Sequence, residues 1–362
     1  MSGQTVGEGD VPFPFRLFCR KEDTSVWTRH RTGPALFFVI AGIAAPTRER
    51  DSQPKSPTYA FLRNGDVWVS SGGIRRQVTR LDDVMDFAIS ADGRTLVLER
   101  WLKDPREIAQ IHPPPQGVKW YDHNILQVEP LEPGRGVSLR ILEGNTKLKS
   151  TCGTVLAMTG DPTMTKQFPA AVRDVLTWQP TTGGPYREFA CSSDRMTIVG
   201  VEEASEQVLR TGNPPQRELL RGGRYSNFFY DVSPNGRYVA YSPHEFVAGE
   251  LCIVKGDAST SCAPVAAESG RISVSDFGEV LFESSLNQGC SYKDALHASP
   301  VPRPGYDKGD ACYALFYWRE SGGNPVQMEF LGGQPHWISP SVASALIEWG
   351  KHKQAKGTSP FR

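Results

Sequence analysis

Short stretches of alternating apolar and polar residues, separated by tight turns, run along most of the chain after residue 57. A clear example is "FAISADGRTLVLER", residues 87–100, in which two alternating stretches flank the bend Ser-Ala-Asp-Gly-Arg. A period of two is typical of strands that bury one face. Ser, Asp and Gly suit tight turns because their side chains bond to nearby backbone or, for Gly, allow a positive φ. The segment therefore predicts two antiparallel strands joined by a bend.

Two later segments repeat this pattern, "YDVSPNGRYVAYS" at residues 230–242 and "ISVSDFGEVLFES" at residues 272–284. Each has a bend serine, a glycine three residues later and a short alternating strand after it. We interpret these bend residues as structural, so that Ser90 and Asp92 are not a catalytic pair. The repeated bend residues are Ser90, Asp92, Gly93, Ser233, Asn235, Gly236, Ser275 and Gly278.

The spacing of the bends indicates a larger repeat. Ser233 and Ser275 are 42 residues apart, Ser275 and Ser339 are 64 apart, and the 143 residues from Ser90 to Ser233 amount to three units. A strand, a glycine turn and another strand precede the bend, starting at Gly65 in one copy. Four-stranded repeats of about 40–45 residues are typical of propeller blades. The sequence therefore predicts an all-β fold, a six- or seven-bladed β-propeller of four-stranded blades over residues 58–338.

The segment that follows, residues 339–362, is the one clear helical pattern. Val342, Leu346 and Trp349 share a face in "SPSVASALIEWGKHKQAKG", and Ser339 or Ser341 can cap the start. We expect a short C-terminal helix and tail.

The first 57 residues are interpreted as a signal peptide and linker. The uncharged run "PALFFVIAGIAA", residues 34–45, follows Arg29 and Arg31 and precedes a polar segment. A basic flank and a short apolar core are typical of secretory signals, and the run is shorter than the ~20 residues of a membrane span. We expect export, to the periplasm of a Gram-negative bacterium, with membrane contact only through this segment. Our hypothesis for the true start is Val26.

Cysteine usage agrees with export. Six cysteines follow the apolar run, an even number that favours disulfides in an exported protein. Pairing of sequential neighbours is the simplest of 15 possible connectivities; free buried thiols are the alternative. A bond between the last two would close a Pro- and Gly-rich insertion. The candidates are Cys152, Cys191, Cys252, Cys262, Cys290 and Cys312.

Charge and motif content exclude several classes of protein. Lys plus Arg and Asp plus Glu are 40 each, which argues against a nucleic-acid-binding protein. No phosphate-binding or dinucleotide-binding loop occurs, so no cofactor is expected. We interpret the local cluster at His112, Asp122 and His123 as solvated, and expect no metal. The acidic pair Asp82–Asp83 is expected to face solvent.

The bend segments "SADGRTLVL" and "SPNGRYVAY" resemble the S-P-D-G-[RK]-x-[IVL]-A-[FY] repeat of TolB-like propellers. The repeat also occurs in the N-terminal propellers of the prolyl oligopeptidase (S9) and dipeptidyl peptidase IV families. "CYALFYWR" and "QPHWISP" are similar to the propeller of proteobacterial lasso-peptide isopeptidases. In those peptidases a serine hydrolase domain follows the propeller. This chain contains no G-x-S-x-G elbow, so we assign no catalytic residues.

Two functions are compatible with these observations. The first is an exported propeller that binds protein or peptide partners and is not catalytic alone. The second is the substrate-gating propeller of a split or truncated S9-type serine peptidase, such as a lasso-peptide isopeptidase, whose partner would be a separate serine hydrolase domain. Either way we expect a protein or peptide ligand.

Overall fold

The structure is a computed structural model in which the chain divides into two units, Met1–Asp51 and Ser52–Arg362. All described residues lie in the second unit. The apolar run at 34–45 and the cluster at His112, Asp122 and His123 lie outside the described residues. The structure describes residues 56–100, 124–132, 136–142, 146–160, 169–182, 186–202, 207–212, 217–222, 227–244, 249–256, 259–265, 269–285, 313–320, 323–330 and 332–355.

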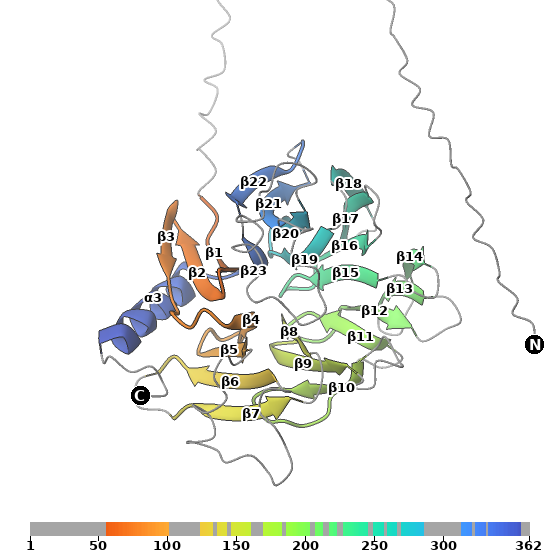
Figure 1. Cartoon of the computed structure of the whole chain (residues 1–362). Coiled ribbons are helices and arrows are strands. Elements are labelled where there is room, and N and C mark those ends of the chain that lie inside the picture. The colour runs from red at the N-terminus through yellow and green to blue at the C-terminus, as the bar shows by residue number, and fades with distance from the viewer. Residues whose placement is uncertain are drawn as a thin grey trace, which may run out of the picture. The chain divides into compact units, whose positions relative to one another are not determined.

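Six antiparallel sheets are arranged around a common centre, as Figure 1 shows, and each sheet is one blade of a propeller. Five blades have four strands, and blade 3 has three among the described residues. The expected all-β propeller is confirmed, with six blades. Blade 1 consists of β23 (Gly333–Trp337), β1 (Tyr59–Arg63), β2 (Asp66–Ser71) and β3 (Ile74–Gln77). Blade 2 consists of β4 (Val84–Ile89), β5 (Thr95–Arg100), β6 (Asn124–Pro130) and β7 (Ser138–Leu142).

The remaining blades follow in chain order. Blade 3 consists of β8 (Thr146–Thr151), β9 (Thr154–Gly160) and β10 (Pro169–Asp174). Blade 4 consists of β11 (Tyr186–Cys191), β12 (Ile198–Glu202), β13 (Gln207–Thr211) and β14 (Arg217–Gly222). Blade 5 consists of β15 (Asn227–Val232), β16 (Tyr238–His244), β17 (Gly249–Lys255) and β18 (Thr260–Val265). Blade 6 consists of β19 (Ser269–Val274), β20 (Glu279–Ser285), β21 (Tyr313–Arg319) and β22 (Val326–Phe330).

The strand named first for each blade above lies nearest the centre, and the others follow outward. In blade 1 this innermost strand is β23. In blade 2 every residue of β4 is buried, whereas the outermost strand of blade 1, β3, is almost entirely exposed. An inner strand is covered on both faces by neighbouring blades, so both of its faces can be apolar. The outer strand is thus the exposed part of a blade, whereas β23, the innermost strand of blade 1, is mostly half-buried and lines the central pocket.

Among the described residues the hydrophobic core consists of six clusters, one between each pair of neighbouring blades. For example, Ala88 and Val97 of blade 2 pack with Leu148 and Val155 of blade 3. Tyr59 of blade 1 belongs to the cluster that includes Leu281 and Leu315 of blade 6. Because every blade is sandwiched in this way, none has a complete core by itself.

The two ends of the propeller meet in blade 1. The late strand β23 pairs antiparallel with the early strand β1, with Tyr59 opposite Trp337 and Ala60 opposite His336. One copy of the sequence repeat therefore does not coincide with one blade. It begins with the two outer strands of one blade, such as β2 and β3, and ends with the inner strand of the next, such as β4. Pairing of β23 with β1 closes the ring.

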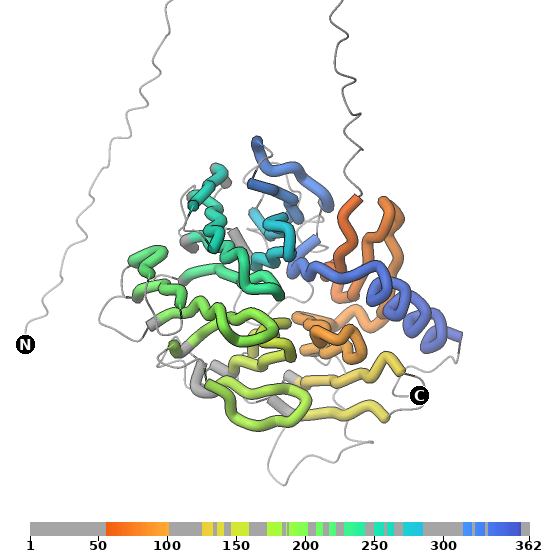
Figure 2. Tube along the Cα trace, turned by 180° about the vertical axis from the view of Figure 1, so that it is seen from behind, coloured from red at the N-terminus to blue at the C-terminus, as the bar shows by residue number. Residues whose placement is uncertain are grey.

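Helix α3 (Pro340–Ala355) follows β23 and packs on β2 and β3 at the outside of blade 1, as Figure 2 shows from behind. The Ser339 Oγ accepts a hydrogen bond from the Val342 N–H at 3.2 Å, so Ser339 is the N-cap. Leu346 is fully buried, and Trp349 packs against the same cluster. The Lys353 Nζ lies 3.0 Å from the Glu129 Oε2 on β6, which ties the helix to blade 2 as well.

Two disulfides join sequential neighbours, as the simplest pairing predicted. Cys152, in the turn after β8, bonds to Cys191 at the end of β11 and so links blades 3 and 4. Cys252 bonds to its cross-strand partner Cys262 within blade 5. Cys290 and Cys312 lie outside the described residues. Disulfides are typical of proteins in oxidising compartments.

One expectation about surface charge was wrong. Asp83 is buried, and its carboxylate accepts hydrogen bonds from the Arg100 Nε at 2.7 Å and Nη2 at 2.6 Å. Its neighbour Asp82 is exposed, as expected. The pairing of two buried side chains in a bidentate ion pair explains how a charged residue is accommodated in the interior.

Substituting Gly93 tests how tightly α3 packs on the ring. Gly93 has a φ of 67°, and a Cβ built on it would overlap with the Val342 Cγ2. Gly72 is the matched control, since its φ is 58° but no atom lies within 4 Å of its Cβ position. We expect Gly72→Ala to lower the free energy of unfolding by about 1 kcal/mol through backbone strain. Gly93→Ala should cost about 1–3 kcal/mol more through overpacking, as measured by urea denaturation.

The variant Gly93→Ala/Val342→Ala should recover part of this difference, because the overlapping methyl groups are gone. Equal losses for the two glycine variants would contradict tight packing of the helix on the bend.

Candidate functional site

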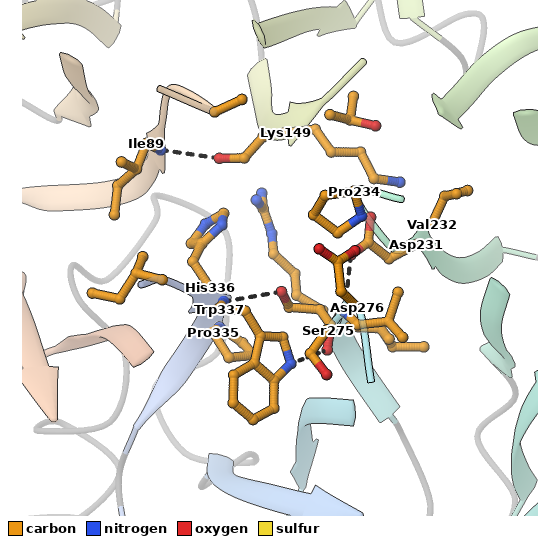
Figure 3. Close-up of a pocket in the computed structure, with 18 of the residues that line it drawn as sticks. Ile89, Lys149, Asp231, Val232, Pro234, Ser275, Asp276, Pro335, His336 and Trp337 are labelled. Carbon is orange, nitrogen blue, oxygen red and sulfur yellow. Dashed lines mark hydrogen bonds between the residues drawn. The ribbon is translucent and has the colours of Figure 1, made fainter. Parts of the chain in front are cut away.

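A pocket of about 980 Å³ lies where the innermost strands converge, and all six blades contribute to its lining. Figure 3 shows Lys149, Asp231 and His336 around this cavity, each from a different blade. The pocket extends from the interior of the ring to the bends between the first and second strands, which form its mouth. Its side chains are therefore positioned by the innermost strands themselves.

The Arg271 side chain crosses the centre of the ring. From β19 in blade 6, its Nη2 pairs with the Asp86 Oδ2 on β4, and its Nη1 donates to the Leu148 carbonyl on β8 at 2.8 Å. Asp86 also accepts hydrogen bonds from the Phe87 N–H at 2.7 Å and the Leu148 N–H at 2.8 Å. Burial raises the pKa of Asp86, and the positive charge of Arg271 opposes that rise. Three blades are connected by this one guanidinium group.

Lys149 crosses the ring from β8. Its Nζ donates to the Tyr230 carbonyl on β15 at 2.8 Å and lies 3.9 Å from the centroid of the Tyr230 ring. Burial lowers the pKa of Lys149 to about 8, although the negative charge of Asp231 favours the ammonium form. An ammonium on an aromatic ring face is a favourable cation–π arrangement. The Lys149 amine is therefore mostly protonated at neutral pH and places a positive charge in the cavity.

Asp231 lies beside this amine. The Asp231 Oδ2 accepts a hydrogen bond from the Val274 N–H on β19 at 3.1 Å, which connects blades 5 and 6. Burial raises the pKa of Asp231 to about 6, and the positive charge of Lys149 opposes the rise. The two groups thus perturb each other in the directions expected for a partly desolvated acid and base.

His336 is held in one tautomer. Its Nε2 lies 2.9 Å from the Phe87 carbonyl oxygen on β4. A carbonyl only accepts hydrogen bonds, so the Nε2 carries the proton and the Nδ1 is an acceptor. Burial, together with the nearby charge of Arg271, lowers the pKa of His336 to about 4. The imidazole is consequently neutral at pH 7.

The mouth of the pocket combines aromatic and polar groups. Phe277, in the bend after β19, is 83 % exposed. Trp337 lines the cavity and is fixed by a hydrogen bond from its Nε1 to the Ser273 carbonyl at 3.0 Å. Exposed Pro234 and Asp276 lie in neighbouring bends. A rigid aromatic wall beside an exposed aromatic side chain suits an amphipathic ligand.

The repeated bend residues hold the turns at this mouth. In the first copy, the Ser90 Oγ donates to the Asp92 Oδ1 at 2.5 Å and accepts from the Thr95 N–H at 3.0 Å. In the second, the Ser233 Oγ donates to the Asn235 Oδ1 at 2.8 Å. The glycines at 93, 236 and 278 all have positive φ. Each serine hydroxyl is engaged within its own bend.

Ser339, counted among the bends by its spacing, is instead the N-cap of α3. A further copy of the bend, at Ser192, escaped the sequence analysis. Ser192 donates to the Asp194 Oδ1 at 2.5 Å, and its Oγ accepts from the Thr197 N–H at 3.0 Å. Arg195 occupies the glycine position with a φ of 62°. The sequence of this bend does have the Ser-x-Asp pattern, but the copies were recognised by a glycine that Arg195 replaces here.

The charged and imidazole groups in the central channel, which is the pocket described above, were missed for a different reason. They come from four blades and share no local motif: Lys149, Asp231, Arg271 and His336.

Elsewhere, Glu250 lies beside Cys252 and Cys262. Those two sulfurs are bonded to each other, so they offer no thiolate to a metal.

No protein-family model matches the chain, and no curated protein matches it. Several solved structures are similar. A protein assigned as TolB from Agrobacterium tumefaciens is 14 % identical, with 76 % of this chain and 90 % of that chain covered and a TM-score of 0.42. A nidogen/laminin complex is 6 % identical, with 78 % and 98 % covered and a TM-score of 0.46.

The β-propeller domain of the Trilobed protease from Pyrococcus furiosus is 10 % identical, with 69 % of this chain and 71 % of that chain covered and a TM-score of 0.35. The two groups indicated by the bend repeat, TolB and protease propellers, are thus among the similar structures. The propeller fold rests on the chain's own strand order.

Removing the Asp231 charge tests the electrostatics of the channel. In Asp231→Asn we expect the pKa of Lys149 to fall below about 8, because the attraction that favours its ammonium form is lost. The pH dependence of reductive methylation at Lys149, followed by mass spectrometry, measures this shift. The control is Asp276→Asn, an exposed mouth residue. An unchanged pKa of Lys149 in Asp231→Asn would contradict the interaction.

Proposed function

We propose that the chain is an exported propeller that binds a peptide segment of a partner at the mouth of its central channel. The observation that carries the proposal is the pocket of about 980 Å³ lined by all six blades. Ligand pockets in proteins typically measure about 300–1,000 Å³. A peptide of a few residues matches this size.

The chemistry of the lining supports a peptide. Phe277 and Trp337 offer apolar surface at the mouth, and Lys149 and Asp231 offer a donor and an acceptor deeper inside. A peptide presents the same combination of apolar side chains and backbone donors and acceptors. The surrounding strands are hydrogen-bonded and disulfide-linked, so the site is pre-organised and loses little entropy on binding.

Export is the second part of the proposal. The disulfides Cys152–Cys191 and Cys252–Cys262 support an oxidising compartment, and the periplasm is our proposed location. Among the described residues, no helix combines the length and apolar character needed to cross a membrane.

Affinity selection tests peptide binding. The purified protein would be mixed with a pool of synthetic random heptapeptides, and retained peptides identified by mass spectrometry. We expect the selected peptides to bind Phe277→Ser at least 10-fold more weakly than wild type, because the exposed anchor is lost. The control is Val326→Ser, since Val326 is 57 % exposed on β22 and does not line the pocket.

Two results would overturn this part of the proposal. One is a pool from which no peptide is retained. The other is a set of selected peptides that bind wild type, Phe277→Ser and Val326→Ser equally.

A phosphatase fusion tests export. Residues 1–57 fused to alkaline phosphatase should give active enzyme in a Gram-negative host, and Phe38→Arg within the apolar run should abolish that activity. Phe13→Arg, the same change outside the run, should have no effect. An inactive wild-type fusion, or equal activity with Phe38→Arg, would contradict export by this segment.

A further inference from the structure

We propose that the channel receives the C-terminal carboxylate of the peptide, with Lys149 as its counter-ion and Asp231 as acceptor for the N–H of the last residue. This inference rests on the proposed function and names the end of the ligand that enters. It begins from a difference between Lys149 and the other cations of the channel.

Lys149 is the channel cation without a carboxylate in contact. Lys147 pairs with Glu188 at 3.8 Å, and Arg271 pairs with Asp86. Among the described residues, no carboxylate oxygen lies within 4.0 Å of the Lys149 Nζ. One of its three protons is donated to the Tyr230 carbonyl. Asp231 and Glu188 favour its ammonium form from beyond contact distance, and an entering carboxylate would supply a partner in contact.

The other positive charges make the same place attractive to an anion. Arg271 disfavours the charged forms of both Lys149 and His336. A carboxylate at the Lys149 Nζ would relieve this repulsion. The acidic groups that act on Lys149 have other partners, since Glu188 pairs with Lys147 at 3.8 Å and the Asp231 Oδ2 accepts the Val274 N–H at 3.1 Å.

Asp231 decides which carboxylate fits. Its Oδ2 accepts the Val274 N–H, and Asp231 lines the same cavity as Lys149 (Figure 3). A terminal residue carries a carboxylate and, on the same Cα, an N–H donor, and this pair complements Lys149 and Asp231. In an acidic residue the side-chain carboxylate is one or two bonds farther from the backbone N–H than a terminal carboxylate is.

The obstruction of the channel points to a chain end. The Arg271 side chain spans from β19 to β4 and β8. Arg271 lines the same pocket as Lys149 and is held to β4 and β8, so we expect an entering chain to stop at this guanidinium group. A terminus fits such a site better than the middle of an extended segment.

Chemical variants of the selected heptapeptides test the inference without relying on a folded mutant. Each peptide would be made with a free C-terminus, with a C-terminal amide, and with an acetylated N-terminus. We expect amidation to weaken binding to wild type at least 10-fold and acetylation to change it less than 2-fold. Fluorescence anisotropy with a labelled side chain measures all three.

Protein variants assign the effect to Lys149. In Lys149→Met the free acid and the amide should bind equally weakly, whereas Lys149→Arg should keep a preference for the acid. Lys351→Met, which removes an exposed charge from α3, should behave as wild type. Thermal melting would show whether each variant is folded.

The outcomes separate this inference from the proposed function. If amidation has no effect but Phe277→Ser still weakens binding, peptide binding stands and the terminal carboxylate is wrong. If acetylation abolishes binding, the channel recognises an N-terminal amine instead. If acidic side chains alone determine binding, whatever the state of the terminus, the carboxylate comes from a side chain and the inference is also overturned.

Discussion

Closure of the ring by β23 and β1 is the interaction on which the rest of the structure depends. No blade has a core of its own, because each hydrophobic cluster is shared between two neighbours. Pairing of Tyr59 with Trp337 gives blade 1 its innermost strand and lets it cover both blade 2 and blade 6. The same pairing sets His336 in the channel. Without it, two interfaces would be exposed and the channel would have a gap in its wall.

The channel shows how such a ring manages polar groups at its centre. The edges of six inner strands converge there, and several of their side chains are charged. Arg271 and Lys149 each cross the ring and bond to backbone carbonyls of other blades. These contacts connect blades that are not neighbours. They also place charged groups where burial shifts their pKa values, as it does for Asp231. The same residues thus connect the blades and carry the shifted pKa values of the pocket.

The fold could be predicted from the sequence because blades repeat and the bend at Ser90 or Ser233 has a local chemical signature. One copy of the repeat was not recognised because another residue, Arg195 with a φ of 62°, occupies the glycine position. Burial of Asp83 could not be predicted, because its partner Arg100 lies on the next strand and only the pairing shows the bidentate bond. The channel site was beyond sequence reasoning, since its members lie close only after the ring has closed.

The make-up of blade 1 has a consequence for the order in which the chain can fold. Strands β1 to β3 are synthesised first, but their innermost partner is residues 333–337. A nascent chain therefore carries a blade with an unpaired inner edge until nearly the whole propeller has been made. Contacts between such distant segments form slowly. The ring can close only after residues 333–337 have been synthesised, so completion of the propeller is a late step in folding.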